Sequence, residues 1–234
     1  MCAVSIEQLI ERRIDKWRAL ELPHPGTRPL APRRPVVTIS REFGAGGRQV
    51  AEALASRMGL ILFDRELIDC VAEQAGISAR IVSSLDETSR SDMETWVEGI
   101  LKARIFDRTE YVHCLLKVMK SLAMRGGCII LGRGANFILQ NEPAAYHFRL
   151  VAPLDVRVAR IAARDGLSHD EALKLVNRVG RERRKFLKDT FPRHNVDDLL
   201  SYHMVFNSGR VGIEAIVEII CRFVENAERS RLAT

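Results

Sequence analysis

A short glycine-rich stretch has the residue types and the spacing that could hold a phosphate group. Residues 40–49 read SREFGAGGRQ, and they follow a β-branched run over 36–40. Behind them, Val50, Leu54 and Met58 recur at helical spacing. Glycines let a backbone take positive φ and approach a ligand, and the N–H groups at the start of a helix attract anions. The pattern therefore predicts an anion-binding turn between a strand and a helix.

Individual residues of this turn have distinct expected roles. Gly44, Ala45, Gly46 and Gly47 would present backbone N–H groups, and Arg48 would add a planar guanidinium suited to phosphate oxygens. The alternative is a tight turn that needs its glycines for shape alone. The order of strand, glycines, helix and cation favours the phosphate interpretation.

Two nucleotide-binding templates each fit the turn in part. The dinucleotide pattern GxGxxG, started at Gly44, has Gln49 in place of its third glycine, while Asp64 follows at a distance suited to a ribose contact. The pattern GxxxxGK[ST] matches Gly46 as its last glycine but has Gly47 in place of lysine.

The composition indicates one globular protein with an anionic partner. The chain has 234 residues, of which 47% are apolar, which suits one α/β domain with an appendage. The net charge of +6 fits both phosphate-handling enzymes and nucleic-acid binders. The five cysteines are scattered without a CxxC pair and the histidines lack metal-ligand spacing, so we expect reduced thiols and no zinc site. We see no membrane span or signal peptide and expect a cytoplasmic protein.

Short apolar runs alternate with helical patterns along most of the chain. The alternation predicts an α/β fold with a parallel sheet and helices on both faces. The expected strands are Val36–Ser40, Leu60–Phe63, Cys128–Leu131, Tyr146–Val151 and Met204–Asn207. A long basic helical stretch over 154–190 and a closing helix over 213–224 complete the pattern.

The first 35 residues form a separate appendage in this interpretation. An amphipathic helix is expected over 5–21, and five prolines then form a stiff linker up to residue 35. We expect this helix to dock either on its own domain or on a second copy of the chain, which would give a homodimer. A dedicated arm that binds another partner is the less favoured alternative.

Polar segments follow three of the expected strands. These segments are 40–48, Asp64-Arg65 and 132–136. Ligands of open parallel sheets bind beyond the carboxyl ends of the strands, so we expect a site where these segments converge.

The order of motifs makes the interpretation more specific. ISREFGAGGRQVAEALASRMGL, FDRELI, IILGRGANFIL, RERRKF and YHMVFNSG follow one another in an order that resembles the cytidylate kinase-like family, a branch of the nucleoside monophosphate kinases. The resemblance covers residues 36–224. It implies a P-loop NTPase-type three-layer sandwich with a five-stranded parallel sheet.

The resemblance also implies an activity and a division of the chain. The activity would be phosphoryl transfer from ATP, with Mg²⁺, to a nucleoside monophosphate, with CMP or dCMP as the acceptor. The appendage over 1–35 would precede a kinase-like domain over 36–228. Within that domain, 66–120 would be a helical acceptor-binding insertion and 155–190 an arginine-rich lid.

The glycine turn departs from the family's GxxGxGKGT at four positions. Gly44 and Gly46 match, whereas Arg41, Gly47, Arg48 and Gln49 replace the first glycine, the lysine, the next glycine and the threonine. The resemblance implies that residues 44–49 bind ATP, with Arg48 as a cation displaced by one position. Because the threonine is lost, Mg²⁺ would be held by Gln49, by water alone, or not at all.

Further site residues follow from the resemblance. Asp64 and Arg65 would contact the acceptor nucleotide, although Arg65 could equally form a surface ion pair. Arg133 matches an arginine that binds the monophosphate, and Gly134 replaces the aspartate that usually follows it.

The expected lid contributes the remaining cations. Arg178 and Arg183, together with Arg48, would stabilise the transferring phosphoryl group and so act in catalysis. Arg160 would flank the ATP base. Gly180 replaces the family's aspartate, and the alternative for many of these arginines is a solvated basic helix face. The full set is Arg157, Arg160, Arg164, Arg178, Arg181, Arg183 and Arg184.

Two other classes of function stay open at this point. A nucleotide-binding regulatory protein with little or no kinase activity would explain the replacements at Gly47, Gln49, Gly134 and Gly180. A nucleic-acid binder is disfavoured, because aromatic residues do not interleave with the arginines.

Overall fold

The structure used here is a computed structural model of the chain. It describes residues 34–64 and 110–233, together with Ile68, Ser91, Glu94, Thr95, Val97 and Glu98. The expected N-terminal helix, Arg65 and most of the expected insertion over 66–120 lie outside the described residues.

Five parallel strands form one sheet in the order β2-β3-β1-β4-β5. The strands are β1 (Val36–Arg41), β2 (Ile61–Phe63), β3 (Cys128–Leu131), β4 (Ala145–Val151) and β5 (Met204–Asn207). All five expected strands are confirmed, and their ends differ from the expected ends by no more than one residue. Because the first strand along the chain lies in the middle of the sheet, the segment that follows it has neighbouring strand ends on both sides.

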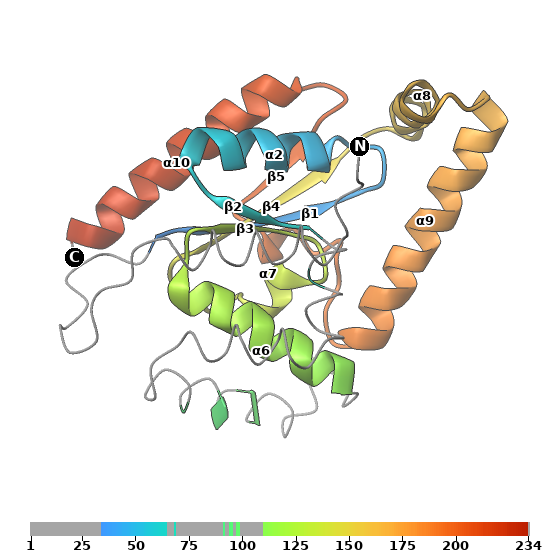
Figure 1. Ribbon diagram of the computed structural model, residues 1–234. Coiled ribbons are helices and arrows are strands. Elements are labelled where there is room, and N and C mark those ends of the chain that lie inside the picture. Colours follow the sequence, from blue (N-terminus) through green and yellow to red (C-terminus); the bar gives the residue numbers. More distant parts are fainter. Residues whose placement is uncertain are drawn as a thin grey trace, which may run out of the picture.

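Helices cover both faces of the sheet (Figure 1). The helices α2 (Gly47–Met58) and α10 (Ile213–Ala233) pack on one face. The helix α6 (Glu110–Arg125) and the short α7 (Ala135–Ile138) pack on the other. The result is the three-layer α/β P-loop kinase fold, and α10 continues past the expected end at residue 224.

The core follows the two-residue period of the strands. On β1, Val36 belongs to the cluster under α6, whereas Val37 and Ile39 belong to the cluster under α2 and α10. All four residues of β3 are buried, as expected for an interior strand of a parallel sheet.

The expected helical stretch over 154–190 is two helices instead of one. The helix α8 (Leu154–Asp165) ends at Gly166, which has a φ of 67°. The helix α9 (His169–Thr190) begins with a capping box, in which the Ser168 side chain accepts from the Glu171 N–H and the Glu171 carboxylate accepts from the Ser168 N–H. The two helices form their own apolar cluster, and α9 runs past the carboxyl edge of the sheet (Figure 1).

Two further expectations concern thiols and membranes. The three cysteines in the described ranges, Cys114, Cys128 and Cys221, are free thiols, as expected, whereas Cys2 and Cys70 lie outside those ranges. Across the described ranges, no helix has both the length and the apolar character that crossing a bilayer requires.

Candidate active site

The glycine turn between β1 and α2 requires glycine for two reasons. Gly44 and Gly46 have φ of 86° and 80°, in the left-handed region that L side chains rarely adopt. A Cβ on Gly44 would lie 2.7 Å from the backbone oxygen of Arg157, and one on Gly46 would lie 2.5 Å from the Ile213 side chain. The turn is therefore held tightly between α8 and the start of α10.

The start of α2 has no side-chain cap, which suits a ligand at this end of the helix. Gly46 is the N-cap residue of α2 and provides no side-chain cap. The first N–H groups of a helix have no partner within the helix, and together with the helix dipole they favour an anion. This geometry fits the phosphate chain of a nucleotide.

A buried serine holds the turn from behind. The Ser208 hydroxyl donates to the carbonyl oxygen of Ala45 over 2.8 Å. Arg160 donates to the same hydroxyl over 3.0 Å and to the Ser208 carbonyl over 2.7 Å. Ser208 was not predicted as a site residue, although it lies in the FNSG sequence that contributed to the resemblance. Arg160 thus lies beside the turn and is engaged by Ser208, and its expected contact with the ATP base stays a prediction.

Arg48 lies on the outer side of the turn. Its guanidinium is 3.3 Å from the Asp64 carboxylate at the end of β2 and 3.8 Å from Glu52 on α2. More than half of the Arg48 side chain is exposed, and Gln49 is exposed next to it. The structure therefore joins two predicted site residues, Arg48 and Asp64, to each other.

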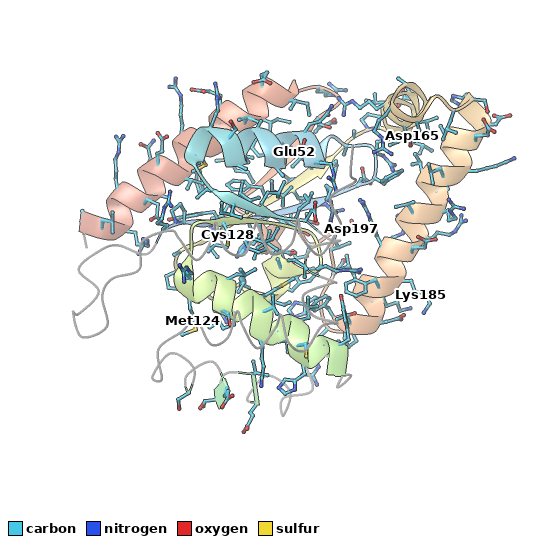
Figure 2. The ribbon with its side chains drawn as sticks, in the orientation of Figure 1. Glu52, Met124, Cys128, Asp165, Lys185 and Asp197 are labelled. Atoms are coloured by element: carbon cyan, nitrogen blue, oxygen red, sulfur yellow. The ribbon has the colours of Figure 1, made fainter. Side chains whose placement is uncertain are left out.

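A cavity of about 140 Å³ lies beyond the carboxyl ends of β1 and β3. The segment after β3 and the second half of α9 close its sides, and Asp197 lies between the sheet edge and α9 (Figure 2). Its charged lining consists of five arginines and three carboxylates, with Asn136 beside them: Arg41, Arg133, Arg149, Arg183, Arg184, Glu42, Glu182 and Asp197. Arginines from three different elements and from the segment after β3 therefore line one space and outnumber its carboxylates, which favours an anionic ligand.

Arg133 has a strained backbone at the edge of this cavity. Its φ is 53°, the one positive φ among the described non-glycine residues, and its guanidinium lies 4.2 Å from the centre of the Phe186 ring on α9. Gly134 follows with a φ of 67°, and a Cβ there would overlap the Phe191 ring. The glycine that replaces the family's aspartate is thus required by local packing. Strained residues of this kind concentrate at functional sites.

Arg183 connects α9, part of the expected lid, to the glycine turn. Its guanidinium donates to the carbonyl oxygen of Arg41 over 3.4 Å and lies 5.3 Å from the centre of the Phe43 ring. Phe43 also packs with the α8–α9 cluster, so both ends of this contact hold the turn against the lid helices. Arg178, which was predicted together with Arg183, is exposed and does not line the cavity.

Arg149 is a cavity residue that the sequence analysis missed. It is buried on β4, with 8% of its surface exposed, and donates to the Asp197 carboxylate over 2.6 Å. It also donates to the Val196 carbonyl and, over 3.4 Å, to the Tyr202 hydroxyl. A sequence signal existed, because this arginine is the single charged residue of the strand AYHFRLV.

Asn136 is the second missed residue of the cavity. It is buried at the start of α7, and its side-chain nitrogen has no hydrogen-bond partner in the described part of the chain. An unpaired buried amide is costly, so this donor is suited to a ligand atom.

The residues present fit a metal that is held mainly by nucleotide phosphates. No group of three or more histidine, cysteine, aspartate or glutamate side chains that could hold a metal occurs within 34–64, 110–233 and the six separately described residues. Mg²⁺ commonly takes one or two protein ligands together with substrate phosphates and water. The Gln49 side-chain oxygen lies beside Gly46, 3.4 Å from where a Cβ would be, which suits a single protein ligand.

Together, the sheet order, the glycine turn and the arginine-lined cavity define a protein of the P-loop kinase class. The sequence model of the cytidylate kinase-like family matches residues 36–210, and the chain belongs to this family.

Known relatives agree with this assignment. A cytidylate kinase of Ignicoccus hospitalis is 30% identical over 191 residues, which cover 81% of this chain and 98% of that protein. A cytidylate kinase of Aeropyrum pernix is 28% identical over 197 residues, with 83% and 99% covered. The solved structure of an uncharacterized protein from Eubacterium ventriosum has a TM-score of 0.62 at 20% identity and covers 82% of this chain and 99% of that one, which supports the fold.

Proposed function

We propose that this protein transfers the γ-phosphoryl group of ATP to a nucleoside monophosphate, with CMP or dCMP as the acceptor. Membership of the cytidylate kinase-like family supports the reaction class, and the curated relatives named cytidylate kinase support the choice of acceptor.

One observation carries the proposal. Arg133, from the segment after β3, and Arg183, from the lid helix, face the same cavity beside the glycine turn. Two phosphate groups of like charge must approach each other for transfer to occur, and neutralising this charge is the main task of such an enzyme. A cavity bordered by a phosphate-binding turn and several guanidinium groups serves that task.

The roles of the residues follow from their positions. The N–H groups of 46–48 would hold the donor phosphates at the start of α2, and Arg183 would neutralise the phosphoryl group in transit. Arg133 and Arg149 would hold the acceptor phosphate in the cavity. An acceptor oxygen then forms a bond to the γ-phosphorus while the bond to the bridging oxygen of ADP breaks. No general base is needed, because the acceptor phosphate is already ionised.

Mg²⁺ would bind together with the donor phosphates and would neutralise part of their negative charge. Gln49 is its candidate protein ligand. Closure of α9 would exclude water from the cavity and limit ATP hydrolysis.

Several predicted roles stay predictions. They include the catalytic roles of Arg48 and Arg178, the base contact of Arg160, the acceptor contacts of Asp64 and Arg65, the N-terminal homodimer and the cytoplasmic location. Arg65 and the N-terminal helix lie outside the described residues.

A nucleotide-binding regulatory protein is the second candidate. The observations that favour it are the glycines at 47 and 180 in place of charged residues, together with the engagement of Arg48 by Asp64. A protein of this kind would bind nucleotide through the same turn without efficient transfer.

A coupled assay with ATP, Mg²⁺ and a panel of nucleoside monophosphates separates these candidates. We expect ADP release that depends on CMP or dCMP and exceeds the release seen with AMP, GMP and UMP. Thermal stabilisation by ATP without turnover on any acceptor would contradict the kinase proposal and favour the regulatory protein.

A further inference from the structure

The arginine that replaces the first glycine of the loop motif has an unusual path. Arg41 is the last residue of β1, and its side chain runs along Gly47, the first residue of α2. A Cβ on Gly47 would lie 2.6 Å from Cγ and 2.9 Å from Cβ of Arg41. The stem of Arg41 therefore occupies the space that a side chain at position 47 would enter first.

The guanidinium of Arg41 then reaches Gly132 at the end of β3. A Cβ on Gly132 would lie 2.9 Å from Cζ and 3.2 Å from Nη2 of Arg41. Gly47 and Gly132 thus form a groove without side chains, and Arg41 lies in it. Its guanidinium also lines the cavity that Arg133 and Arg183 face.

The two departures from the motif are therefore linked in space. Position 47, where the motif has its lysine, is glycine, and position 41, where the motif has a glycine, is arginine. With both changes, one cation is lost and one is gained on the same side of the turn. A lysine at 47 together with Arg41 would produce a steric clash, so each replacement fits the other.

Arg48 is a weaker candidate for this cation. The Arg48 guanidinium lies beside Asp64 and Glu52 outside the cavity, whereas Arg41 lines the cavity. In addition, the Arg41 carbonyl accepts a hydrogen bond from Arg183, which places the lid cation beside the same residue.

We propose that Arg41 supplies the cation that binds the nucleotide phosphates at the glycine turn, in place of the missing lysine at position 47. The inference rests on the proposed use of ATP and adds the residue that makes the altered loop competent. A guanidinium is permanently charged and can donate two parallel hydrogen bonds to a phosphate. It therefore carries the same charge as the ammonium of a lysine and offers more hydrogen-bond donors.

Calorimetric titration of the full chain with ATP and with inorganic tripolyphosphate tests this inference. In Arg41→Gln, which keeps most of the stem but removes the charge, we expect both affinities to fall roughly 10- to 100-fold, the range of a hydrogen bond to a charged group. Arg41→Lys should retain most of the affinity, and Arg222→Ala, an exposed change on α10, should retain all of it.

Two additional measurements separate phosphate binding from a structural role. Guanidinium chloride at millimolar concentration should restore part of the ATP affinity of Arg41→Ala, because the ion can enter the vacated groove. The double variant Arg41→Gly with Gly47→Lys should bind ATP better than either single variant, since the lysine then has the space that Arg41 occupied. Circular dichroism and thermal melting check that each variant is folded.

The results distinguish this inference from the proposed function. Unchanged ATP and tripolyphosphate affinity in folded Arg41→Gln, with a loss in Arg48→Ala, would overturn the assignment and leave the kinase proposal standing. Loss in Arg41→Gln with no turnover of the unaltered chain on any monophosphate would support the assignment and contradict the kinase. An unaltered chain that binds neither ATP nor tripolyphosphate would overturn both.

Discussion

Two polar side chains on one face of β4 meet very different surroundings. His147 and Arg149 are two residues apart and both are buried, opposite Thr38 and Ser40 on β1. Arg149 is at the cavity end of the strand and donates to the Asp197 carboxylate. His147 lies one step further from the edge, and its Nδ1 is 2.7 Å from the Thr38 hydroxyl.

Burial has a different consequence for each of these two side chains. Burial and the neighbouring His203 lower the pKa of His147 to about 4, so this imidazole is neutral near pH 7. The arginine cannot lose its proton and is instead held by a carboxylate, a carbonyl and a hydroxyl. The contrast shows a cationic side chain at the carboxyl edge of the sheet, where an anion would bind. Two residues further into the sheet, on the same face, the side chain is a neutral imidazole.

The largest expected effect comes from removing one of the cationic side chains at the cavity. In Arg183→Ala we expect turnover to fall about a thousandfold, the range seen when an arginine that stabilises a transferring phosphoryl group is lost. The variant should keep its fold, because Arg183 is half-buried and its hydrogen bond to the Arg41 carbonyl is long, at 3.4 Å. Steady-state assays alongside Arg222→Ala measure the effect, and a fall below threefold would remove Arg183 from the mechanism.

The second prediction concerns His147 and the pH dependence of the unfolding free energy. Because the pKa of His147 is lower in the folded protein than its ordinary value of 6.5, the unfolded chain binds this proton more readily. Its contribution to stability is complete above about pH 6.5 and is lost as the pH falls toward 4. A shift of this size corresponds to roughly 3 kcal/mol of unfolding free energy.

Urea unfolding between pH 7.5 and pH 4 measures this loss. The pKa of His203 is also lowered by burial, so the second histidine adds to the same trend. The variant His147→Gln should show a shallower dependence on pH than the unaltered chain. An identical dependence in both proteins would show that His147 does not titrate as proposed.

A third and smaller effect concerns the backbone that supports Arg133. Gly134 and Gly166 have the same φ of 67°, but a Cβ on Gly134 meets the Phe191 ring, whereas one on Gly166 meets nothing within 4 Å. Gly166→Ala should therefore lower the unfolding free energy by about 1 kcal/mol, the cost of the left-handed conformation alone. Gly134→Ala should lower it by about 2–3 kcal/mol, because overpacking adds to that cost.

The two glycine variants form a matched pair for thermal or urea unfolding. Equal losses of stability would show that the ring of Phe191 moves away without penalty. In that case Gly134 would not be required by packing, and its replacement of an aspartate would need another explanation.

Local sequence patterns were sufficient to predict the sheet and one side of the site. Each strand was a short apolar run with clear ends. Motif order singled out Arg133 and Arg183, which both line the cavity, while their roles toward a ligand stay predictions. The break at Gly166 was missed, although the glycine and the capping box at Ser168 both signal a helix boundary.

Side-chain direction and long-range pairing were beyond the sequence. Nothing local indicates that Arg48 turns toward Asp64, because that contact depends on the placement of β2 in the sheet. The path of the Arg41 side chain past Gly47 to Gly132 likewise depends on the pairing of β1 with β3. The missing lysine at position 47 and the extra arginine at 41 were both visible. Their proximity became apparent only in the folded chain.

The most direct measurement is a crystal structure of the full chain with a non-hydrolysable ATP analogue and Mg²⁺. The account predicts phosphate oxygens within hydrogen-bond distance of the N–H groups of 46–48 and of the Arg41 guanidinium, with Arg183 closing from α9. Triphosphate bound away from the turn, or bound there with Arg41 and Arg183 both directed to solvent, would contradict it.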